Sequence, residues 1–247
     1  MAHKFLVWML ASGLAGFLAL QGCGGSAGSS KSSDSKTSAA EAAASSEDAS
    51  SSVAQTQPSA ASKVPNIGAK VSDGGVFKTF PIYGDAKSPD NHYIPSGWMG
   101  DFGDIKINDK FMTSAHSGST CVQIVYTNAA TQGARWAGIY WQNPPNNWGT
   151  RPGGYDLTGA KKLTFWARGE KGGERIEEFK IGGITGEYAD SDVAGIGPVV
   201  LTTEWQQFTI DLEGKDLSSI SGGFCWATNL DVNPDGATFY LDDIRYE

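Results

Sequence analysis

The feature that most limits the fold is a set of short segments in which apolar and polar residues alternate. In residues 162–168 (KLTFWAR) every second residue from Leu163 is apolar, and residues 206–212 (QQFTIDL) repeat the pattern from Phe208. A period of two places one row of side chains on each face of a β-strand. No segment keeps the 3.6-residue period of an amphipathic helix over several turns. The chain is therefore expected to form an all-β domain.

Seven strands are expected, separated by Gly, Pro, Asn and Asp residues. They cover residues 121–127, 136–142, 162–168, 177–182, 206–212, 223–227 and 238–246. Residues 169–173 have the composition of a hairpin turn between two of them. Short alternating strands with frequent turn signals favour a two-sheet antiparallel β-sandwich. We place this domain at residues 64–247, which is long enough to bury a full core.

The first 22 residues are typical of a secretory signal peptide, since an apolar run (FLVWMLASGLAGFLAL) follows Lys4. The run is followed by Leu20-Gln21-Gly22-Cys23, which resembles the bacterial lipobox. This motif predicts acylation of Cys23 and attachment of the exported protein to a lipid bilayer. In a host with two membranes, the pattern favours the outer membrane or cell surface. An ordinary signal peptide with a chance cysteine is the alternative.

Residues 23–63 are expected to form a flexible Ser/Ala-rich tether, because the segment 26–62 holds 14 Ser and 10 Ala and no aromatic residue. Such a segment buries too little apolar surface to offset the entropy lost on ordering. A lipid anchor followed by a spacer would hold the folded domain away from the bilayer.

The net charge argues against a nucleic-acid-binding protein, and the small number of His and Cys residues argues against a zinc protein. The chain has 19 basic and 27 acidic residues, for a net charge of −8, which argues against a nucleic-acid partner bound through its phosphates. It has three His and three Cys. A zinc site needs three or four such ligands, so one is nearly excluded.

Three stretches carry a resemblance to a known family. They are residues 156–169 (DLTGAKKLTFWARG), 204–212 (EWQQFTIDL) and 238–246 (TFYLDDIRY). Together they resemble jelly-roll carbohydrate-binding modules, of which family 11 and its galactose-binding-like relatives are the nearest type. The resemblance implies two antiparallel sheets, a poly- or oligosaccharide lying across the concave one, and in many members a structural calcium ion. Non-catalytic glycan binding is the function it implies.

Candidate sugar contacts are aromatic residues on outward-facing rows, because a flat ring covers the apolar face of a sugar. With the Ile139 row taken as core, Trp136 and Tyr140 face outward. Trp166 and Arg168 share the outer row of another strand. Ordinary packing beneath covering loops is the alternative for each ring.

Two segments rich in aromatic and turn residues are expected to be loops that add to this site. They contribute Trp98 and Trp148, with Asp101 as a polar neighbour. Pinning of long loops by Pro and Trp is the alternative.

Asp242 and Asp243 are adjacent on the last expected strand, so their side chains should point to opposite faces. One of them must then approach the interior, where a carboxylate needs a cation or several donors. The resemblance suggests calcium, held by oxygen ligands. A salt bridge or a capped strand end is the alternative.

Cys121 and Cys225 remain as a pair once Cys23 is acylated. An even pair in an exported domain suggests a disulfide, provided that their strands are neighbours. Two separate buried thiols are the alternative.

Within the expected domain, residues 64–247, the sequence lacks the Gly-x-Ser-x-Gly, His-Glu-x-x-His, P-loop and Cys-x-x-Cys motifs, so a non-enzyme is favoured. A protein that docks another envelope protein through the same aromatic face is a second hypothesis. A glycan-cleaving enzyme is a third, and it would need two carboxylates facing each other across the concave sheet.

Overall fold

The computed structural model describes residues 76–247. The expected signal peptide (1–22), the lipidation residue Cys23, the tether (23–63) and the first residues of the expected domain lie outside this range. The described residues form β-strands and a single 3-10 helix, η1 (Phe102–Asp104). No helix among them is long and apolar enough to cross a membrane.

The strands follow one another along the chain as short segments. Their bounds are β1 (Phe80–Tyr83), β2 (Ile94–Gly100), β3 (Ile105–Phe111), β4 (Cys121–Tyr126), β5 (Trp136–Gln142), β6 (Lys162–Gly169), β7 (Arg175–Ile176), β8 (Glu178–Gly182), β9 (Val193–Ile196), β10 (Val199–Val200), β11 (Gln206–Asp211), β12 (Gly222–Asn229) and β13 (Ala237–Tyr246).

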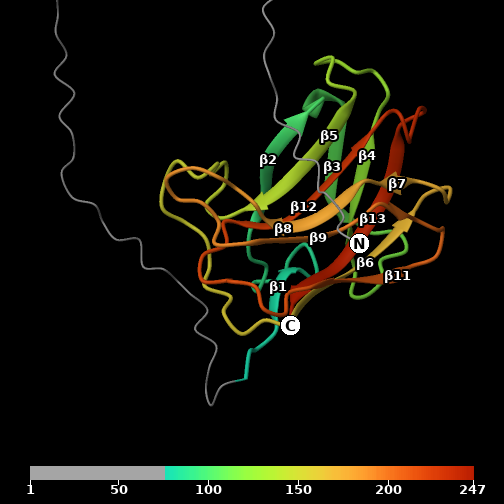
Figure 1. Ribbon diagram of the computed structural model, residues 1–247. Coiled ribbons are helices and arrows are strands. Elements are labelled where there is room, and N and C mark those ends of the chain that lie inside the picture. Colours follow the sequence, from blue (N-terminus) through green and yellow to red (C-terminus); the bar gives the residue numbers. More distant parts are fainter. Residues whose placement is uncertain (1–75) are drawn as a thin grey trace, which may run out of the picture. The chain divides into compact units, whose positions relative to one another are not determined.

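These strands make two antiparallel sheets that face each other (Figure 1). One sheet has six strands in the order β11-β6-β13-β4-β3, with β1 paired to the far half of β13. The other has five strands in the order β2-β5-β12-β8-β9, and β7 and β10 form a separate two-stranded ribbon. The expected two-sheet antiparallel sandwich is confirmed.

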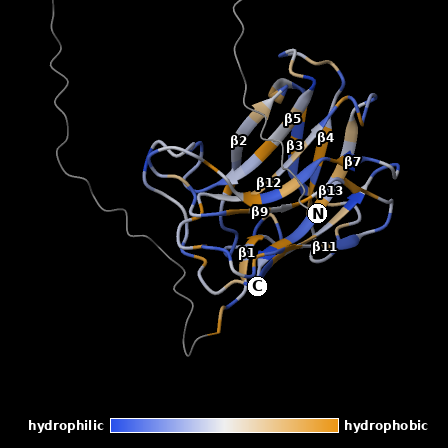
Figure 2. Cartoon of the chain, viewed as in Figure 1, coloured by the Kyte–Doolittle hydropathy of each residue, from blue (hydrophilic) through white to orange (hydrophobic). Residues whose placement is uncertain are grey.

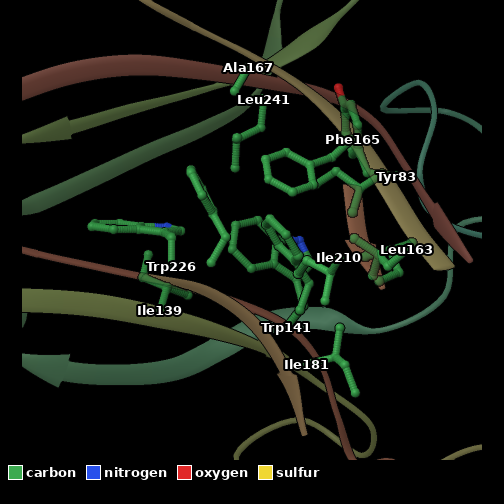
Figure 3. Close-up of a cluster of buried hydrophobic side chains, with 14 of the residues drawn as sticks. Tyr83, Ile139, Trp141, Leu163, Phe165, Ala167, Ile181, Ile210, Trp226 and Leu241 are labelled. Carbon is green, nitrogen blue, oxygen red and sulfur yellow. The ribbon is translucent and has the colours of Figure 1, made fainter. Parts of the chain in front are cut away.

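The core fills the space between the sheets and comes from the inward row of each strand (Figure 3). Leu163, Phe165 and Ala167 of β6 are buried there, opposite Ile139 and Trp141 of β5. Figure 2 shows hydrophobic and hydrophilic segments interleaved along the strands. Burial of each large side chain contributes about 1.5–3 kcal/mol, so the alternating pattern drives this arrangement.

Two buried tyrosines hold the start of β12 in place. Tyr93 donates its hydroxyl to the carbonyl of Ile220 at 2.8 Å, and Tyr246 donates to the carbonyl of Gly223 at 2.7 Å. A Cβ on Gly223 would lie 2.5 Å from the Tyr93 ring. Because Tyr246 belongs to β13, its hydrogen bond joins the two sheets across the core.

Six strands were not expected from the sequence, namely β1, β2, β3, β7, β9 and β10. In β2 (IPSGWMG) a proline and two glycines hide the alternation. The expected hairpin at residues 169–173 is wrong. Strand β6 already has β11 and β13 as its neighbours, so this segment leads to β7, which pairs with β10.

The expected disulfide is also wrong, because Cys121 and Cys225 are both free and buried. Cys121 lies in β4 of the six-stranded sheet, whereas Cys225 lies in β12 of the five-stranded sheet. Cys225 packs with Tyr140 and Ile184, outside the main core. Burial raises the pKa of Cys121 to about 11, which keeps this thiol protonated at neutral pH.

Reduction should therefore leave the stability of the protein unchanged. A disulfide closing a loop of about 100 residues would add about 4.7 kcal/mol to the free energy of unfolding. We expect the same thermal unfolding curve with and without dithiothreitol, measured by circular dichroism on the full chain. A clear drop in unfolding temperature on reduction, absent from the Cys121→Ser variant, would contradict the pairing of strands described above.

Candidate functional site

The outer face of the five-stranded sheet carries a patterned set of side chains. Residues paired across an antiparallel sheet point to the same side, so the register defines rows that cross the strands. One row holds Trp136 and Asn229, the next holds Met99, Gly138, Ala227 and Glu178, and a third holds Gly97, Tyr140, Cys225, Lys180 and Gly195. We call this surface, together with Trp148 of the loop after β5, the aromatic face.

The middle of the aromatic face has two small residues, Gly138 and Ala227, which we call the low strip, and the Met99 side chain packs against Gly138. A Cβ on Gly138 would lie 2.6 Å from the carbonyl oxygen of Trp226 and 2.9 Å from the Met99 methyl group. The close pairing of β5 with its neighbours therefore requires glycine here. The strip is bordered by Trp136 on one side and by the Tyr140 row on the other.

Two tryptophan rings on this face are exposed to solvent. Trp136 and Trp148 each have 41% of their surface accessible. Tyr140, expected as a third contact, lies on the expected face but is only 4% exposed. Its ring meets Trp148 edge-on, with centroids 5.9 Å apart, and its hydroxyl donates to the Gly182 carbonyl at 3.1 Å. Tyr140 therefore supports Trp148, and this burial raises its pKa.

The loop that carries Trp148 is anchored on both sides of the ring. Gln142 donates its side-chain amide to the Asn147 carbonyl at 3.0 Å. The backbone N–H of Tyr188 donates to the Gly149 carbonyl, also at 3.0 Å. Asp190 in turn accepts backbone N–H groups of Ile184, Ser221 and Gly222, and its burial raises the pKa of its carboxyl.

Charged groups border the low strip and balance each other. Lys180 pairs with Glu178 at 2.8 Å, and its Nζ lies 5.6 Å from the centroid of the Tyr140 ring. The pair supplies both donors and acceptors at the surface without a net charge. Asn229, half-buried beside Trp136, adds an amide.

The structure separates Trp98 and Asp101 from the aromatic face. Trp98 lies on β2 and not in a loop, and its pairing with Ile139 puts it on the core side of the edge strand, where it is 38% exposed. Asp101 is fully buried and accepts the backbone N–H groups of Gln132, Ala134 and Arg135. Asp101 therefore holds the loop before β5.

Trp166 and Arg168 face outward as expected, but from the six-stranded sheet, on the opposite side of the sandwich. His116 stacks on Trp166 with centroids 3.8 Å apart, and Trp205 donates its indole N–H to the Ser114 carbonyl. The Arg168 guanidinium lies 3.9 Å from the centroid of the Tyr240 ring. These side chains pack against one another beneath residues 112–119 and share no surface with Trp136 and Trp148.

Asp242 and Asp243 face the same turn, contrary to expectation. Asp243 has a φ of +47° at an irregularity in the β6–β13 register. Its side chain therefore points toward His116 and Ser117, which also contact Asp242. Asp242 accepts the backbone N–H groups of His116 and Ser117, at 2.9 and 3.2 Å. Asp243 pairs with the His116 Nδ1 atom at 2.8 Å.

Calcium at this pair stays a prediction, and the surroundings do not fit it. The ion takes six to eight oxygen ligands, whereas backbone N–H groups occupy Asp242, and the Ser117 hydroxyl and the His116 Nδ1 atom contact Asp243. Within residues 76–247 no group of three His, Cys, Asp or Glu side chains is arranged to hold a metal ion. A hydrogen-bonded pair that closes the turn over Trp166 describes the arrangement better.

Sequence reasoning missed Met99, Glu178, Lys180 and Tyr188. Glu178 and Lys180 alternate with the buried Phe179 and Ile181, so a signal for their outward direction was present in the sequence. Met99 and Tyr188 gave no such signal, because β2 was not recognised and the loop position of Tyr188 depends on its bond to Gly149.

The known proteins found to be similar to this chain are solved structures. No protein-family model matches the sequence, and no curated protein matches it. A family 30 carbohydrate-binding module is similar, with 17% identity over 69% of this chain and 98% of that chain, and a TM-score of 0.48. The family 11 module of a cellulosomal cellulase of Clostridium thermocellum is 14% identical over 63% of this chain and 88% of its own, with a TM-score of 0.40. A xylan-binding domain from Paenibacillus barcinonensis is 13% identical over 70% and 93%, with a TM-score of 0.39.

Replacement of Asp101 by Asn should destabilise the domain. The amide has one acceptor oxygen where the carboxylate has two, and its N–H₂ group would face backbone donors. We expect a loss of about 2 kcal/mol in the free energy of unfolding, measured by urea denaturation. The exposed Asp109→Asn serves as a matched control and should unfold like the wild type. Equal stability of Asp101→Asn and Asp109→Asn would contradict this role of Asp101.

The stability of the protein should also depend on the protonation of Asp242. Burial raises the pKa of this carboxyl from the ordinary 3.8 to about 6, so the folded state binds the proton more tightly than the unfolded state. The resulting stabilisation is fully present below pH 3.8 and is lost as the pH rises through about 6. We expect wild-type stability to fall over this window relative to Asp242→Asn, measured by urea unfolding at a series of pH values. Parallel pH profiles for the two proteins would contradict the burial of this group.

Proposed function

We propose that this chain is a non-catalytic glycan-binding protein that holds a poly- or oligosaccharide on the aromatic face. The observation that carries the proposal is the combination of two exposed tryptophans, Trp136 and Trp148, with a low strip between their positions. An exposed indole can cover the apolar face of a sugar ring. The Glu178–Lys180 pair and the Asn229 amide offer hydrogen bonds to hydroxyl groups beside it.

The arrangement suits a chain of several sugar units better than a single sugar. Trp136 and Tyr140 are four residues apart on one extended strand, which corresponds to about 13 Å. Trp148 contacts Tyr140 at the far end of that distance. A ligand that reaches both tryptophans must therefore extend along β5, over the small side chain of Ala227 and the Met99 side chain that packs against Gly138.

The balanced charge of the face favours an uncharged or weakly charged glycan. Lys180 is already paired with Glu178, so neither charge is free to select an ionic ligand. The similar solved structures are named as carbohydrate-binding modules. The proposal for this chain rests on its own face, since those structures differ from it at most positions.

We propose further that the domain works at a membrane surface. The lipobox-like segment ending at Cys23 and the Ser/Ala-rich segment 23–63 support an acylated N-terminus with a spacer. In a host with two membranes, the anchor would hold the protein at the outer membrane or cell surface, where glycans of the envelope or surroundings are within reach. Metabolic labelling with a palmitate analogue, compared between wild type and Cys23→Ser, tests this part by itself.

The binding proposal is tested on an array of soluble plant and bacterial polysaccharides, followed by calorimetry with each glycan that binds. We expect Trp136→Ala and Trp148→Ala each to lower the affinity about tenfold or more, because each removes one stacking surface. Trp98→Ala is the matched control, since this ring is exposed to a similar degree but lies on the core side of β2. Its affinity should equal that of the wild type.

Ala227→Leu gives an independent test of the low strip. The larger side chain would rise between the two tryptophans and block a ligand that spans them, while the strand pairing stays intact. Binding that survives this change, or loss of affinity in Trp98→Ala alone, would move the site away from the aromatic face. If no glycan on the array binds, the proposal fails and a protein partner becomes the hypothesis to pursue.

A further inference from the structure

A pocket of about 230 Å³ lies at one margin of the sandwich, because its wall includes the end strand of each sheet, β2 and β3. The wall is completed by residues of β1, β4 and β5 and of the link from β1 to β2. We call it the seam pocket. It lies between the two sheets and shares no wall residue with the aromatic face, which is on the outer side of the five-stranded sheet.

The seam pocket contains an indole N–H that has no partner. Trp141 lines the pocket, and 2% of its surface is exposed. The Nε1 atom of Trp226 is also unpartnered, but it is sealed within the core and has no accessible surface. The Nε1 atom of Trp141 donates no hydrogen bond within residues 76–247 and is not sealed in this way. The small exposed part of Trp141 therefore includes its N–H, and a group inside the pocket can accept from it.

The wall around this donor is apolar. Ile82 and Val122 line the pocket and are each 1% exposed. Tyr83 and Tyr93 also line it, but each already donates its hydroxyl to a backbone carbonyl, at 2.7 and 2.8 Å. Trp141 is therefore the wall residue that offers an open donor in the interior of the pocket.

The mouth of the pocket has groups that suit a sugar ring. Ile94 is 51% exposed and lies next to the half-buried Pro95, so an apolar surface borders the opening. Asp109 is exposed there and adds a carboxylate. Asn91 uses one amide hydrogen on a backbone carbonyl at 2.8 Å, which leaves the other for a ligand. Sugar hydroxyl groups both donate and accept, so they match a carboxylate beside an amide.

The size of the seam pocket favours one substituent of a ligand over a whole ligand. Sites that enclose a complete small molecule have volumes of about 300–1,000 Å³. A substituent that fits here needs an acceptor for the Trp141 N–H and an apolar end for Ile82 and Val122. An acetamido group has both, in its carbonyl and its methyl. An ammonium group has no acceptor, and a carboxylate would bring a second negative charge close to Asp109.

We propose that the seam pocket binds the acetamido group of an N-acetyl amino sugar. The carbonyl accepts from the Trp141 N–H, the methyl packs on Ile82 and Val122, and the ring stays at the mouth beside Ile94. An acetylated lysine side chain carries the same group, but its aliphatic stem has no hydroxyls for the polar groups at the mouth. The inference does not depend on glycan binding at the aromatic face.

The test is a nuclear magnetic resonance titration of the ¹⁵N-labelled full chain, because the indole N–H signals of its eight tryptophans can be followed one by one. The Trp141 signal is identified by sequential assignment of the wild-type protein, which needs no variant. The probes are N-acetylglucosamine, glucosamine, glucose and Nε-acetyl-lysine. We expect N-acetylglucosamine to shift the Trp141 signal and to bind about tenfold more tightly than glucose or glucosamine.

Val122→Ile adds one methyl group inside the pocket and should weaken N-acetylglucosamine binding about fivefold or more. Val125→Ile is the matched control, since it makes the same change on the same strand outside the seam pocket and should bind like the wild type. Asp109→Ala, at the exposed mouth, should weaken binding about threefold and keeps the test open if Val122→Ile fails to fold.

The inference is overturned if N-acetylglucosamine leaves the Trp141 signal in place, or if glucose binds equally well. Unchanged binding in both Val122→Ile and Asp109→Ala would also overturn it. Tighter binding of Nε-acetyl-lysine would overturn the assignment to a sugar and point to an acetylated peptide. Trp148→Ala, which tests the aromatic face, should leave the shift of the Trp141 signal unchanged, so the two sites can fail separately.

Discussion

The pairing register of β5 with β12 is the constraint on which the aromatic face depends. Paired residues share a face, so the register that buries Ile139 with Trp226 also turns Trp136 and Tyr140 outward. A slip of one residue would exchange the two rows and place the core side chains in water. The hydroxyl of Tyr246 on the Gly223 carbonyl helps to prevent such a slip, because it ties β12 to a strand of the opposite sheet.

The loops beside the two outer faces of the sandwich decide which aromatic side chains are exposed to solvent. On the six-stranded sheet, His116 and Ser117 bond the carboxylates of Asp242 and Asp243, and the loop they belong to lies over Trp166. On the five-stranded sheet, the neighbouring loops bind each other through Tyr188 and Gly149 and leave Trp136 and Trp148 exposed. Aromatic residues occur on both faces, but only one face presents exposed tryptophans beside a low strip.

The local pattern of the sequence predicted the sandwich and the direction of the rows on β5 and β6, since alternation within a strand depends on that strand alone. It could not say which rows share a surface. Trp136 and Trp166 both point away from the core, yet they belong to different sheets, as do Cys121 and Cys225. The shared direction of Asp242 and Asp243 was hidden for another reason, because a positive φ at Asp243 breaks the alternation on which the expectation relied.

The position of β13 at the C-terminal end of the domain affects the order in which the six-stranded sheet can form. It pairs with β4, β6 and β1, so three segments that come off the ribosome earlier have their common neighbour in residues 237–246. Until that strand arrives, the inner edges of β4 and β6 are unpaired and their apolar rows are exposed, which is a state prone to aggregation. The six-stranded sheet can therefore be completed only after the last of its strands has been synthesised.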